Sequence, residues 1–176
     1  MSMKLKPINF QKWIDEHRHL LKPPVGNQQV WEDTDFMVTV VGGPNSRKDY
    51  HINEGEEFFY QLEGNMNLRM WIEGKPQDFP ICAGDIFLLP PKVPHSPQRP
   101  EGSIGIVIEK KRLPTELDGF VWYCENCQNK LYEEFLYVTS IVRDLKPVFD
   151  RFYGLDKNCT CKKCGHKMLK QQGTSN

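Results

Sequence analysis

The chain has 176 residues, of which 39% are hydrophobic, and its 23 basic side chains are balanced by 23 acidic ones. That length suffices for one hydrophobic core with an appendage, and the balanced charge excludes a general attraction to nucleic acid or anionic lipid. The first residues lack the apolar segment of a signal peptide and no run of ~18 apolar residues occurs, so we expect a cytoplasmic protein without a membrane partner.

A short amphipathic helix is expected near the N-terminus. Asn9 is a good helix cap, and Pro23-Pro24 would stop the helix. The residues that recur at helical spacing, mostly apolar, are Phe10, Trp13, Ile14, His17 and Leu20 or Leu21. One apolar stripe of this kind predicts a helix that packs on the outside of another layer.

From residue 29 to residue 108 the pattern changes to short β-branched and aromatic segments separated by turns. The expected strands are Phe36–Val41, Glu57–Leu62, Met66–Ile72, Asp85–Leu89 and Ile104–Ile108. In Met66–Ile72 the apolar residues alternate, as one half-buried strand face requires. Strands without intervening helices predict a mainly β sandwich or barrel.

After Pro114 the composition changes again, which predicts two domains, 1–114 and 115–176. The second should hold a strand over Leu131–Val138 and a helix over Thr139–Tyr153 that breaks at Pro147. Residues 171–176 are small and polar and are expected to form a frayed tail.

Two histidines and a carboxylate stand at suggestive spacing within the expected strands. His51 is followed by Glu57, Gly64 and Gly84, and then by Pro90 and His95. This order resembles the two motifs of the cupins, whose fold is a jelly-roll barrel (double-stranded β-helix). Asn53 stands where most metal-binding cupins have another histidine. The remaining His51, Glu57 and His95 match the two-histidine, one-carboxylate set that holds Fe(II) with positions left open.

Taken singly, each of these residues has an ordinary alternative. His51 could be a strand-end histidine, His95 a loop residue, and Glu57 is one of three acids in four positions with Glu54 and Glu56. Their joint spacing favours the metal site.

Further segments resemble one cupin family, the 3-hydroxyanthranilate 3,4-dioxygenases, over nearly the whole chain. The matching runs are Gly42–His51, Glu56–Gln61, Pro91–Arg99, Ile108-Glu109 and Trp122–Cys124. The resemblance implies an Fe(II) enzyme that opens the ring of 3-hydroxyanthranilate with O2. The product, 2-amino-3-carboxymuconate semialdehyde, would close without an enzyme to quinolinate, a precursor of NAD formed from tryptophan.

The resemblance also implies roles for four residues around the substrate. Arg99 would bind its carboxylate, for which a planar guanidinium is suited, and Arg47 would lie near O2 and that carboxylate. Glu109 would face the amine and hydroxyl as a proton acceptor, and Glu57 would contact the substrate as well as the metal. Without the resemblance, both arginines could be surface residues, and Glu109 could simply begin a charged loop.

Four of the six cysteines form a second candidate metal site. Cys124 and Cys127 make one C-x2-C pair, and Cys161 and Cys164 make another. Four thiolates on two tight turns are typical of a structural Zn or rubredoxin-type Fe site. A pair of disulfides or a nucleic-acid-binding zinc ribbon are the less favoured interpretations. The other two, Cys82 in an expected strand segment and Cys159, are expected to be spectators or packing residues.

Two functions therefore remain open at the level of sequence. The first is the ring-opening dioxygenase, and the second is a non-catalytic metal-binding cupin that acts as a binding or regulatory protein. The incomplete metal ligand set and the nearby Arg47, Arg99 and Glu109 favour the enzyme, because a structural metal would be closed by a fourth protein ligand. By the same resemblance we expect a homodimer.

Overall fold

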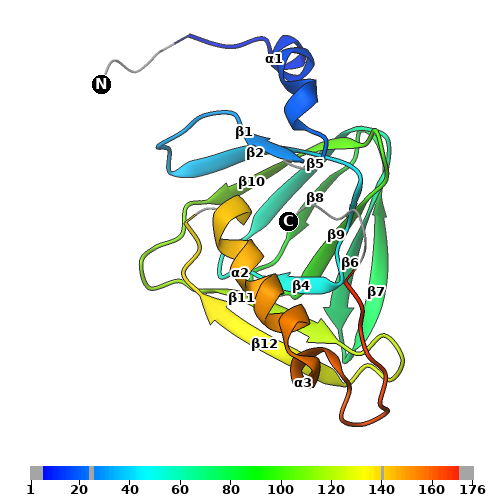
Figure 1. Ribbon diagram of the computed structural model, residues 1–176. Helices are drawn as coiled ribbons and strands as arrows, with labels where there is room; N and C mark the ends of the chain where they lie inside the picture. The colour runs from blue at the N-terminus through cyan, green and yellow to red at the C-terminus, as the bar shows by residue number, and fades with distance from the viewer. Residues whose placement is uncertain (1–5, 24–25, 140, 171–176) are drawn as a thin grey trace.

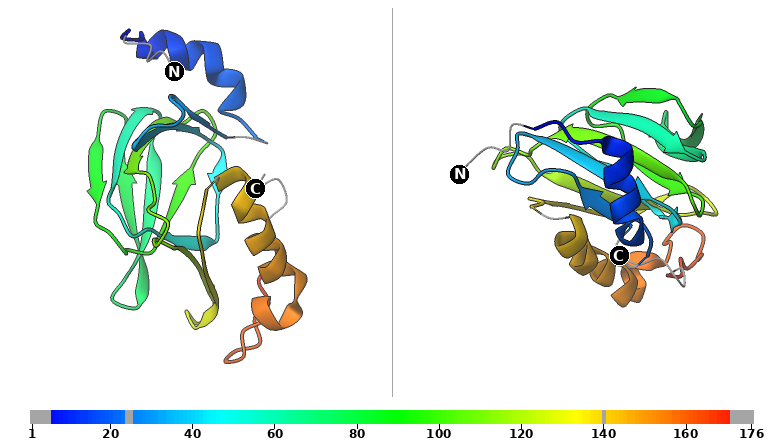
Figure 2. Two further views of the ribbon diagram at one scale, coloured as in Figure 1. Left: turned by 90° about the vertical axis from the view of Figure 1, so that its left-hand side faces the viewer. Right: turned by 90° about the horizontal axis from the view of Figure 1, so that it is seen from above.

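The structure is a computed structural model that describes residues 6–23, 26–139 and 141–170 (Figure 1). Two antiparallel sheets form a barrel, one helix lies across its end and another runs along its side (Figure 2). This is the mainly β jelly-roll architecture of a cupin, as predicted. No helix among the described residues is both long and apolar enough to cross a lipid bilayer.

The two sheets are built from strands that lie far apart in the chain. In the five-stranded sheet the order is β1 (Asn27–Gln29), β2 (Phe36–Gly42), β10 (Ile104–Lys110), β5 (Glu57–Glu63) and β8 (Ile86–Leu89). In the seven-stranded sheet the order is β12 (Lys130–Leu136), β11 (Asp118–Tyr123), β4 (Asp49–Ile52), β9 (His95–Arg99), β6 (Met66–Ile72) and β7 (Lys75–Ile81), with β3 (Asn45–Ser46) also paired to β9.

The inward-pointing side chains of the strands fill the space between the two sheets. Met66, Leu68 and Met70 of β6 are buried, and they pack with Phe59 of β5 and Leu89 of β8. The predicted alternation in this strand is therefore confirmed. Successive side chains of a strand point alternately into and out of the barrel, so residues i and i+2 of one strand face the same interior space.

The five strands predicted between residues 36 and 108 are confirmed, but several further strands were not predicted. Strands β4 and β9 are short, and β9 contains Pro97. Strand β7 contains Pro76 and Pro80 and lies at the edge of its sheet, where a missing backbone N–H is tolerated. Strand β11 is buried along most of its length, so it lacks the alternation that identifies a half-buried strand.

The predicted N-terminal helix is present as α1 (Phe10–His17), followed by a 3-10 turn η1 (Arg18–Leu20). The side chain of Asn9 accepts a hydrogen bond from the backbone N–H of Lys12 at 2.9 Å, as a cap should. Ile14 packs with Val40 on the outer face of the five-stranded sheet. The expected stop at Pro23-Pro24 includes residue 24, which lies outside the described residues.

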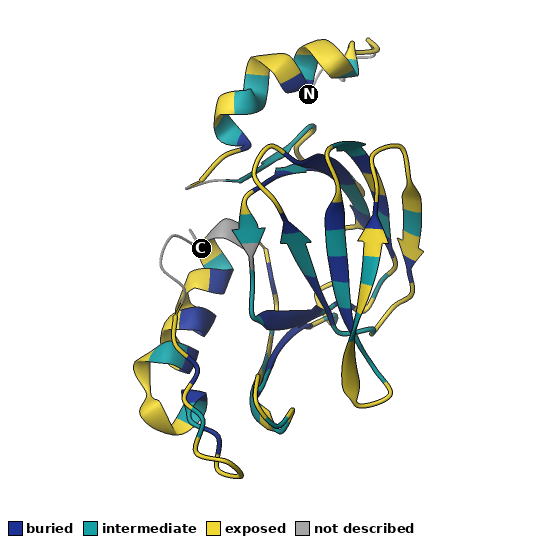
Figure 3. Cartoon of the chain, turned by 90° about the vertical axis from the view of Figure 1, so that its right-hand side faces the viewer, coloured by how far each residue is buried: buried dark blue, intermediate teal, exposed yellow. Residues whose placement is uncertain are grey.

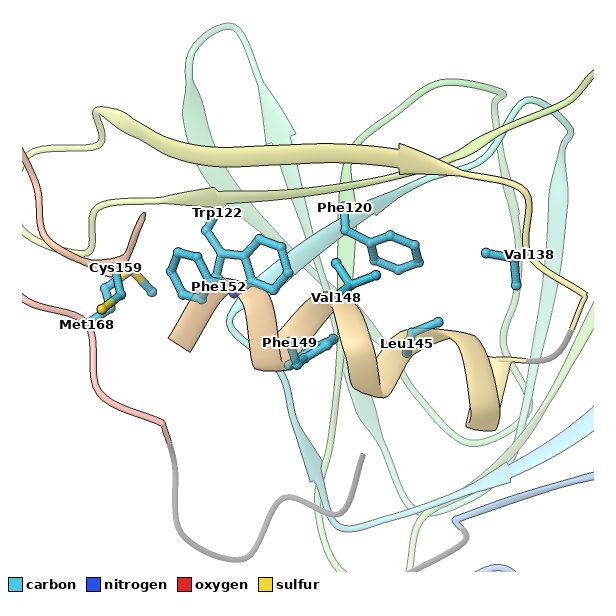
Figure 4. Close-up of a cluster of buried hydrophobic side chains, with 9 residues drawn as sticks. All are labelled: Phe120, Trp122, Val138, Leu145, Val148, Phe149, Phe152, Cys159 and Met168. Carbon is cyan, nitrogen blue, oxygen red and sulfur yellow. The ribbon is translucent and has the colours of Figure 1, made fainter. Parts of the chain in front are cut away.

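The C-terminal region adds strands to the barrel as well as helices. Strand β11 pairs with β4 on one edge and with β12 on the other. Helix α2 (Ile141–Gly154) packs against the face of β11 that carries Phe120 and Trp122, as Figure 4 shows. A short helix, α3 (Asp156–Cys159), follows. The strand and the helix expected here are confirmed. The division into domains 1–114 and 115–176 stays a prediction, and the expected tail at 171–176 lies outside the described residues.

One expectation for α2 was wrong, because the helix continues through Pro147 without a break. Pro147 is exposed, so the backbone carbonyl that it leaves unpaired can bond to water. The buried side of the helix carries Phe149 and Phe152, and the latter stacks on Trp122 at 4.4 Å between ring centroids. This packing of one apolar face, visible as the buried stripe in Figure 3, outweighs the loss of one hydrogen bond.

Candidate functional site

Three ligand side chains converge inside the barrel from the two sheets. His51 of β4 and His95 of β9 are directly paired in register, while Glu57 begins β5 in the opposite sheet. Nε2 of His95 lies 3.4 Å from Oε1 of Glu57, and Nδ1 of His51 lies 3.6 Å from the same oxygen. One ligand atom from each residue lies within 4.8 Å of the other two. The structure therefore places the three predicted ligands around one point.

Hydrogen bonds outside this triad orient its members. Nδ1 of His95 faces the backbone carbonyl of Val93 at 3.0 Å, which makes that nitrogen the donor and leaves Nε2 free to ligate. The second ring nitrogen of His51 lies 3.6 Å from a carboxylate oxygen of Asp118. A carboxylate behind a histidine ligand is a common way to fix the ring in metal sites.

The charges of the triad suit a divalent cation. Burial by itself would raise the pKa of Glu57, but the neighbouring His95 and His51 more than offset it and hold the pKa well below its usual range. Burial lowers the pKa of His51 despite the opposing effect of Asp118. An ionised carboxylate between two imidazoles, buried and with no fourth protein ligand in the described cluster, is a donor set that can hold a divalent metal ion.

Asn53 takes a supporting position beside the triad. Its side-chain NH2 donates to Glu57 at 3.2 Å and to Glu109 at 2.9 Å. An amide NH2 group is a hydrogen-bond donor, so the group that faces the triad here cannot act as a metal ligand. The residue that replaces a cupin histidine thus links the metal-binding carboxylate to a second carboxylate.

Glu109 of β10 lies directly opposite Glu57 of β5 in register. Burial, with the negative charge of Glu57 adding to it, raises the pKa of Glu109 to about 7. Nη1 of Arg112 lies 2.7 Å from Glu109, and its Nε donates to Asp118 at 3.1 Å. A network therefore runs from Glu109 through Arg112 and Asp118 to His51. Sequence reasoning missed Arg112 and Asp118, because nothing in the run Lys110-Lys111-Arg112 marks one cation as buried.

Arg99 of β9 is buried without a negative partner. Its side chain is 3% exposed, and Nη1 donates to the side-chain oxygen of Gln61 at 3.0 Å. The Nε atom has no hydrogen-bond partner, and burial lowers the pKa of the guanidinium to about 10. In the described part of the chain no carboxylate lies within ion-pair distance of it. An uncompensated buried cation of this kind favours binding of an anionic ligand.

Arg47 differs from Arg99 although both line the same cavity. Its Nε donates to Asp49 at 3.0 Å, and its guanidinium carbon lies 5.9 Å from the ring centre of Phe149 in α2. Its charge is already balanced, and its side chain is 18% exposed. Among the described residues that line this cavity, Arg99 is thus a cation without an ion-pair partner and Arg47 a paired one.

A cavity of about 130 Å³ opens beside the triad between the sheets. Besides the charged groups it is lined by Asn27, Thr39, Val41, Asn45, Phe59, Pro97 and Val107. A cavity of about 150 Å³ can hold a benzene ring, so this space suits a ligand with a single aromatic ring. Sequence reasoning did not single out Asn27 or Thr39, and it included Asn45 only as part of the matching run Gly42–His51.

The four predicted cysteines also come together, away from the cavity. Sγ of Cys124 lies 3.6 Å from that of Cys164, and Sγ of Cys127 lies 3.5 Å from that of Cys161. Four sulfurs at about 2.3 Å from a tetrahedral metal would be about 3.8 Å apart, so the cluster fits such an ion. All four are free thiols.

The two cysteine turns are alike, and the two other cysteines take no part in them. The turns close when the N–H groups of Gln128 and Gly165 bond to the carbonyls of Cys124 and Cys161, each at 2.8 Å. Cys159 is buried in the core beneath α2, as expected for a packing residue. Cys82 is exposed in the turn after β7, which corrects its assignment to a strand segment.

Comparisons with known proteins show the family to which the chain belongs. The family model described as 3-hydroxyanthranilic acid dioxygenase matches residues 2–153. A 3-hydroxyanthranilate 3,4-dioxygenase of Ruegeria pomeroyi is 60% identical, covering 92% of this chain and 91% of the relative. One from Xanthomonas euvesicatoria is 58% identical, covering 93% of both chains. A solved cupin-2 domain protein from Shewanella frigidimarina is 21% identical over 63% of this chain and 100% of that one, with a TM-score of 0.47.

The two relatives are similar to this chain over its full barrel and into the four-cysteine region. Identity near 60% over more than nine tenths of both sequences means that these relatives share the fold of this chain over the compared part. Both relatives are named as dioxygenases, and a metal-capable triad beside an open cavity is compatible with that activity. The chain belongs to the 3-hydroxyanthranilic acid dioxygenase family.

Proposed function

We propose that this dioxygenase uses Fe(II) to convert 3-hydroxyanthranilate and O2 into 2-amino-3-carboxymuconate semialdehyde. The bond between the hydroxyl-bearing ring carbon and its unsubstituted neighbour breaks, and both oxygen atoms enter the product. Loss of water then closes the product to quinolinate for the synthesis of NAD from tryptophan. The observation that carries the proposal is Arg99, a buried cation without a negative partner beside an open set of metal ligands.

His51, Glu57 and His95 would hold the metal, because their ligand atoms already surround one point. Fe(II) bound there supplies open positions at which an aromatic substrate and O2 can meet and exchange electrons. The fixed ring of His95 and the lowered pKa of Glu57 mean that the ligands need little rearrangement to accept the ion.

The cavity residues would orient and deprotonate the substrate. Arg99 binds the substrate carboxylate with two parallel hydrogen bonds, which removes its unpaired charge. Glu109 lies next to the triad, with a pKa near neutral, and takes the proton that the substrate hydroxyl releases. Glu57 contacts the same part of the substrate, and the apolar walls at Phe59 and Val107 enclose the ring.

Arg47 would serve as a second cation close to O2 and the substrate carboxylate. Its pairing with Asp49 keeps its side chain at the cavity wall, in the cavity that the triad also lines. Because its charge is balanced, it contributes orientation more than net attraction.

The test is reconstitution without oxygen. The protein is loaded with Fe(II) anaerobically, 3-hydroxyanthranilate is added, and air is admitted while the absorbance of the semialdehyde is followed. One equivalent of O2 consumed per product formed is expected. Protein that binds stoichiometric iron but forms no product would instead indicate a non-catalytic cupin.

The four-cysteine cluster would hold a second metal, zinc or iron, with a structural role. Its four thiolates fill a tetrahedral shell, so no position is open for substrate. We also propose that the enzyme acts in the cytoplasm as a homodimer. The outer face of the five-stranded sheet exposes the apolar side chains Phe36, Tyr60, Ile86 and Leu88, which suits a subunit contact. Light scattering over a range of concentrations tests the dimer.

A further inference from the structure

Among the described residues, the side chain of Arg99 donates a hydrogen bond to one partner, the neutral Gln61. Gln61 of β5 is 1% exposed, and its side-chain oxygen accepts from Arg99 while its NH2 donates to the backbone carbonyl of Glu63 at 3.0 Å. Arginine offers only donors, so the amide must present its oxygen to Arg99. The orientation of Gln61 is thus fixed at both ends.

The neutrality of this partner stands out against the other arginines of the site. Arg112 faces Glu109 and Asp118, and Arg47 faces Asp49. Glutamate has the same length as glutamine and would give Arg99 an internal ion pair. Glutamine instead holds the guanidinium in place and leaves its charge uncompensated for a ligand.

Gly105 of β10 makes room for this pair. It lies opposite Gln61 in register, and a Cβ on it would come within 2.6 Å of the Gln61 side-chain oxygen and 2.9 Å of Nη1 of Arg99. Neither atom is the free end of a mobile surface chain, because both residues are buried. A side chain at position 105 would therefore displace the hydrogen bond that positions Arg99.

We propose that Gln61, with the space left by Gly105, is a positioning residue that determines selectivity for aromatic substrates with a carboxylate. This inference rests on the proposed role of Arg99 in binding the substrate carboxylate. Gln61 acts through Arg99, holding the guanidinium toward the cavity without neutralising it.

The experiment measures equilibrium binding, so that turnover is not required. Iron-loaded protein is titrated anaerobically in a calorimeter with 3-hydroxyanthranilate and with 2-aminophenol, which has the same hydroxyl and amine but no carboxylate. Gln61→Glu, Gln61→Met and Gly105→Ala are compared with Gln77→Glu, which makes the same charge change on β7 outside the cavity lining. Arg99→Met reports on the underlying role of Arg99.

Gln61→Glu is expected to raise the Kd of 3-hydroxyanthranilate at least tenfold and that of 2-aminophenol less than twofold, because the new carboxylate occupies Arg99. Gln61→Met and Gly105→Ala should raise the first Kd by a smaller factor, and Gln77→Glu should change neither. Equal changes for the two ligands, or none, while Arg99→Met still weakens only 3-hydroxyanthranilate, would overturn the role of Gln61. If Arg99→Met has no such effect, the proposed substrate contact itself fails. Should the Gln61 variants not fold, Gly105→Ala decides by the same comparison.

Discussion

The cavity and the four-cysteine cluster both gather side chains that could hold a metal ion, yet their surroundings differ. At the cavity, three potential ligands of two kinds lie beside a cation without an ion-pair partner and a carboxylate with a raised pKa. At the cluster, four thiols of one kind face each other on two matching turns. The first arrangement leaves charge and coordination unsatisfied for a ligand, whereas the second satisfies itself once a metal is bound. The unpaired charge and the open coordination positions therefore distinguish the cavity, as the candidate site of reaction, from the four-cysteine cluster.

The largest effect is expected from the triad. His95→Ala should lower turnover by at least ~10³-fold, about 4 kcal/mol of barrier, because two protein ligands cannot hold the metal in a facial geometry. Glu57→Gln should lose activity as well, since a neutral amide does not balance the charge of the ion. Steady-state kinetics with metal analysis measure this, and the exposed His19→Ala is the control. Near-normal turnover by His95→Ala with full iron would contradict the site.

The next effect concerns the free cation. Arg99→Ala should weaken binding of 3-hydroxyanthranilate by ~2–4 kcal/mol, the typical effect of removing one partner of a buried charge pair. Binding of 2-aminophenol should weaken much less. Arg69→Ala, which breaks a half-exposed ion pair with Asp78, is the matched control. Equal losses for both ligands would show that Arg99 does not recognise the carboxylate.

The cluster should respond in stability and leave the chemistry intact. A metal in the cluster would tie Cys127 to Cys161 across 34 positions, a loop whose closure entropy is about 3 kcal/mol. Cys161→Ser should therefore lower the Tm by about 6–12 °C and release that metal. The exposed Cys82→Ser should change neither. Activity per catalytic iron in the folded Cys161→Ser protein should stay near wild type. A loss beyond ~tenfold would mean that the cluster takes part in catalysis.

The smallest effect is expected where the two regions meet. Phe120 of β11 stacks on His51 at 5.2 Å between ring centres and belongs to the core beneath α2. Phe120→Leu should lower the free energy of unfolding by about 1–2 kcal/mol and leave turnover within about threefold, because the strand still holds His51 in register. Denaturant unfolding and kinetics measure both, with the half-exposed Phe135→Leu as control. A large kinetic loss would mean that the core of α2 controls the metal ligands.

Much of the architecture was predictable because local patterns report burial. The alternation of apolar residues identified β6, and a helix cap with an apolar stripe identified α1. Motif spacing favoured Glu57 over Glu56 as the buried carboxylate, and in the structure Glu57 is buried whereas Glu56 is exposed. Failures occurred where tertiary context overrides local preference. Helix α2 passes through Pro147 because packing on β11 stabilises it, and β11 itself is buried on both faces.

The sequence by itself determined which residues can bind metal and, through its resemblance to one family, which arginines and acids accompany them. Only the tertiary structure decided which charges are compensated. Arg47 and Arg99 look alike in the sequence, yet one faces Asp49 and the other faces Gln61. Arg112 and Asp118 became visible as part of the site only when β10 and β11 were placed beside His51. The physical reason is that one charge compensates another only at short distance, and distances between neighbouring strands cannot be read from the order of residues in the chain.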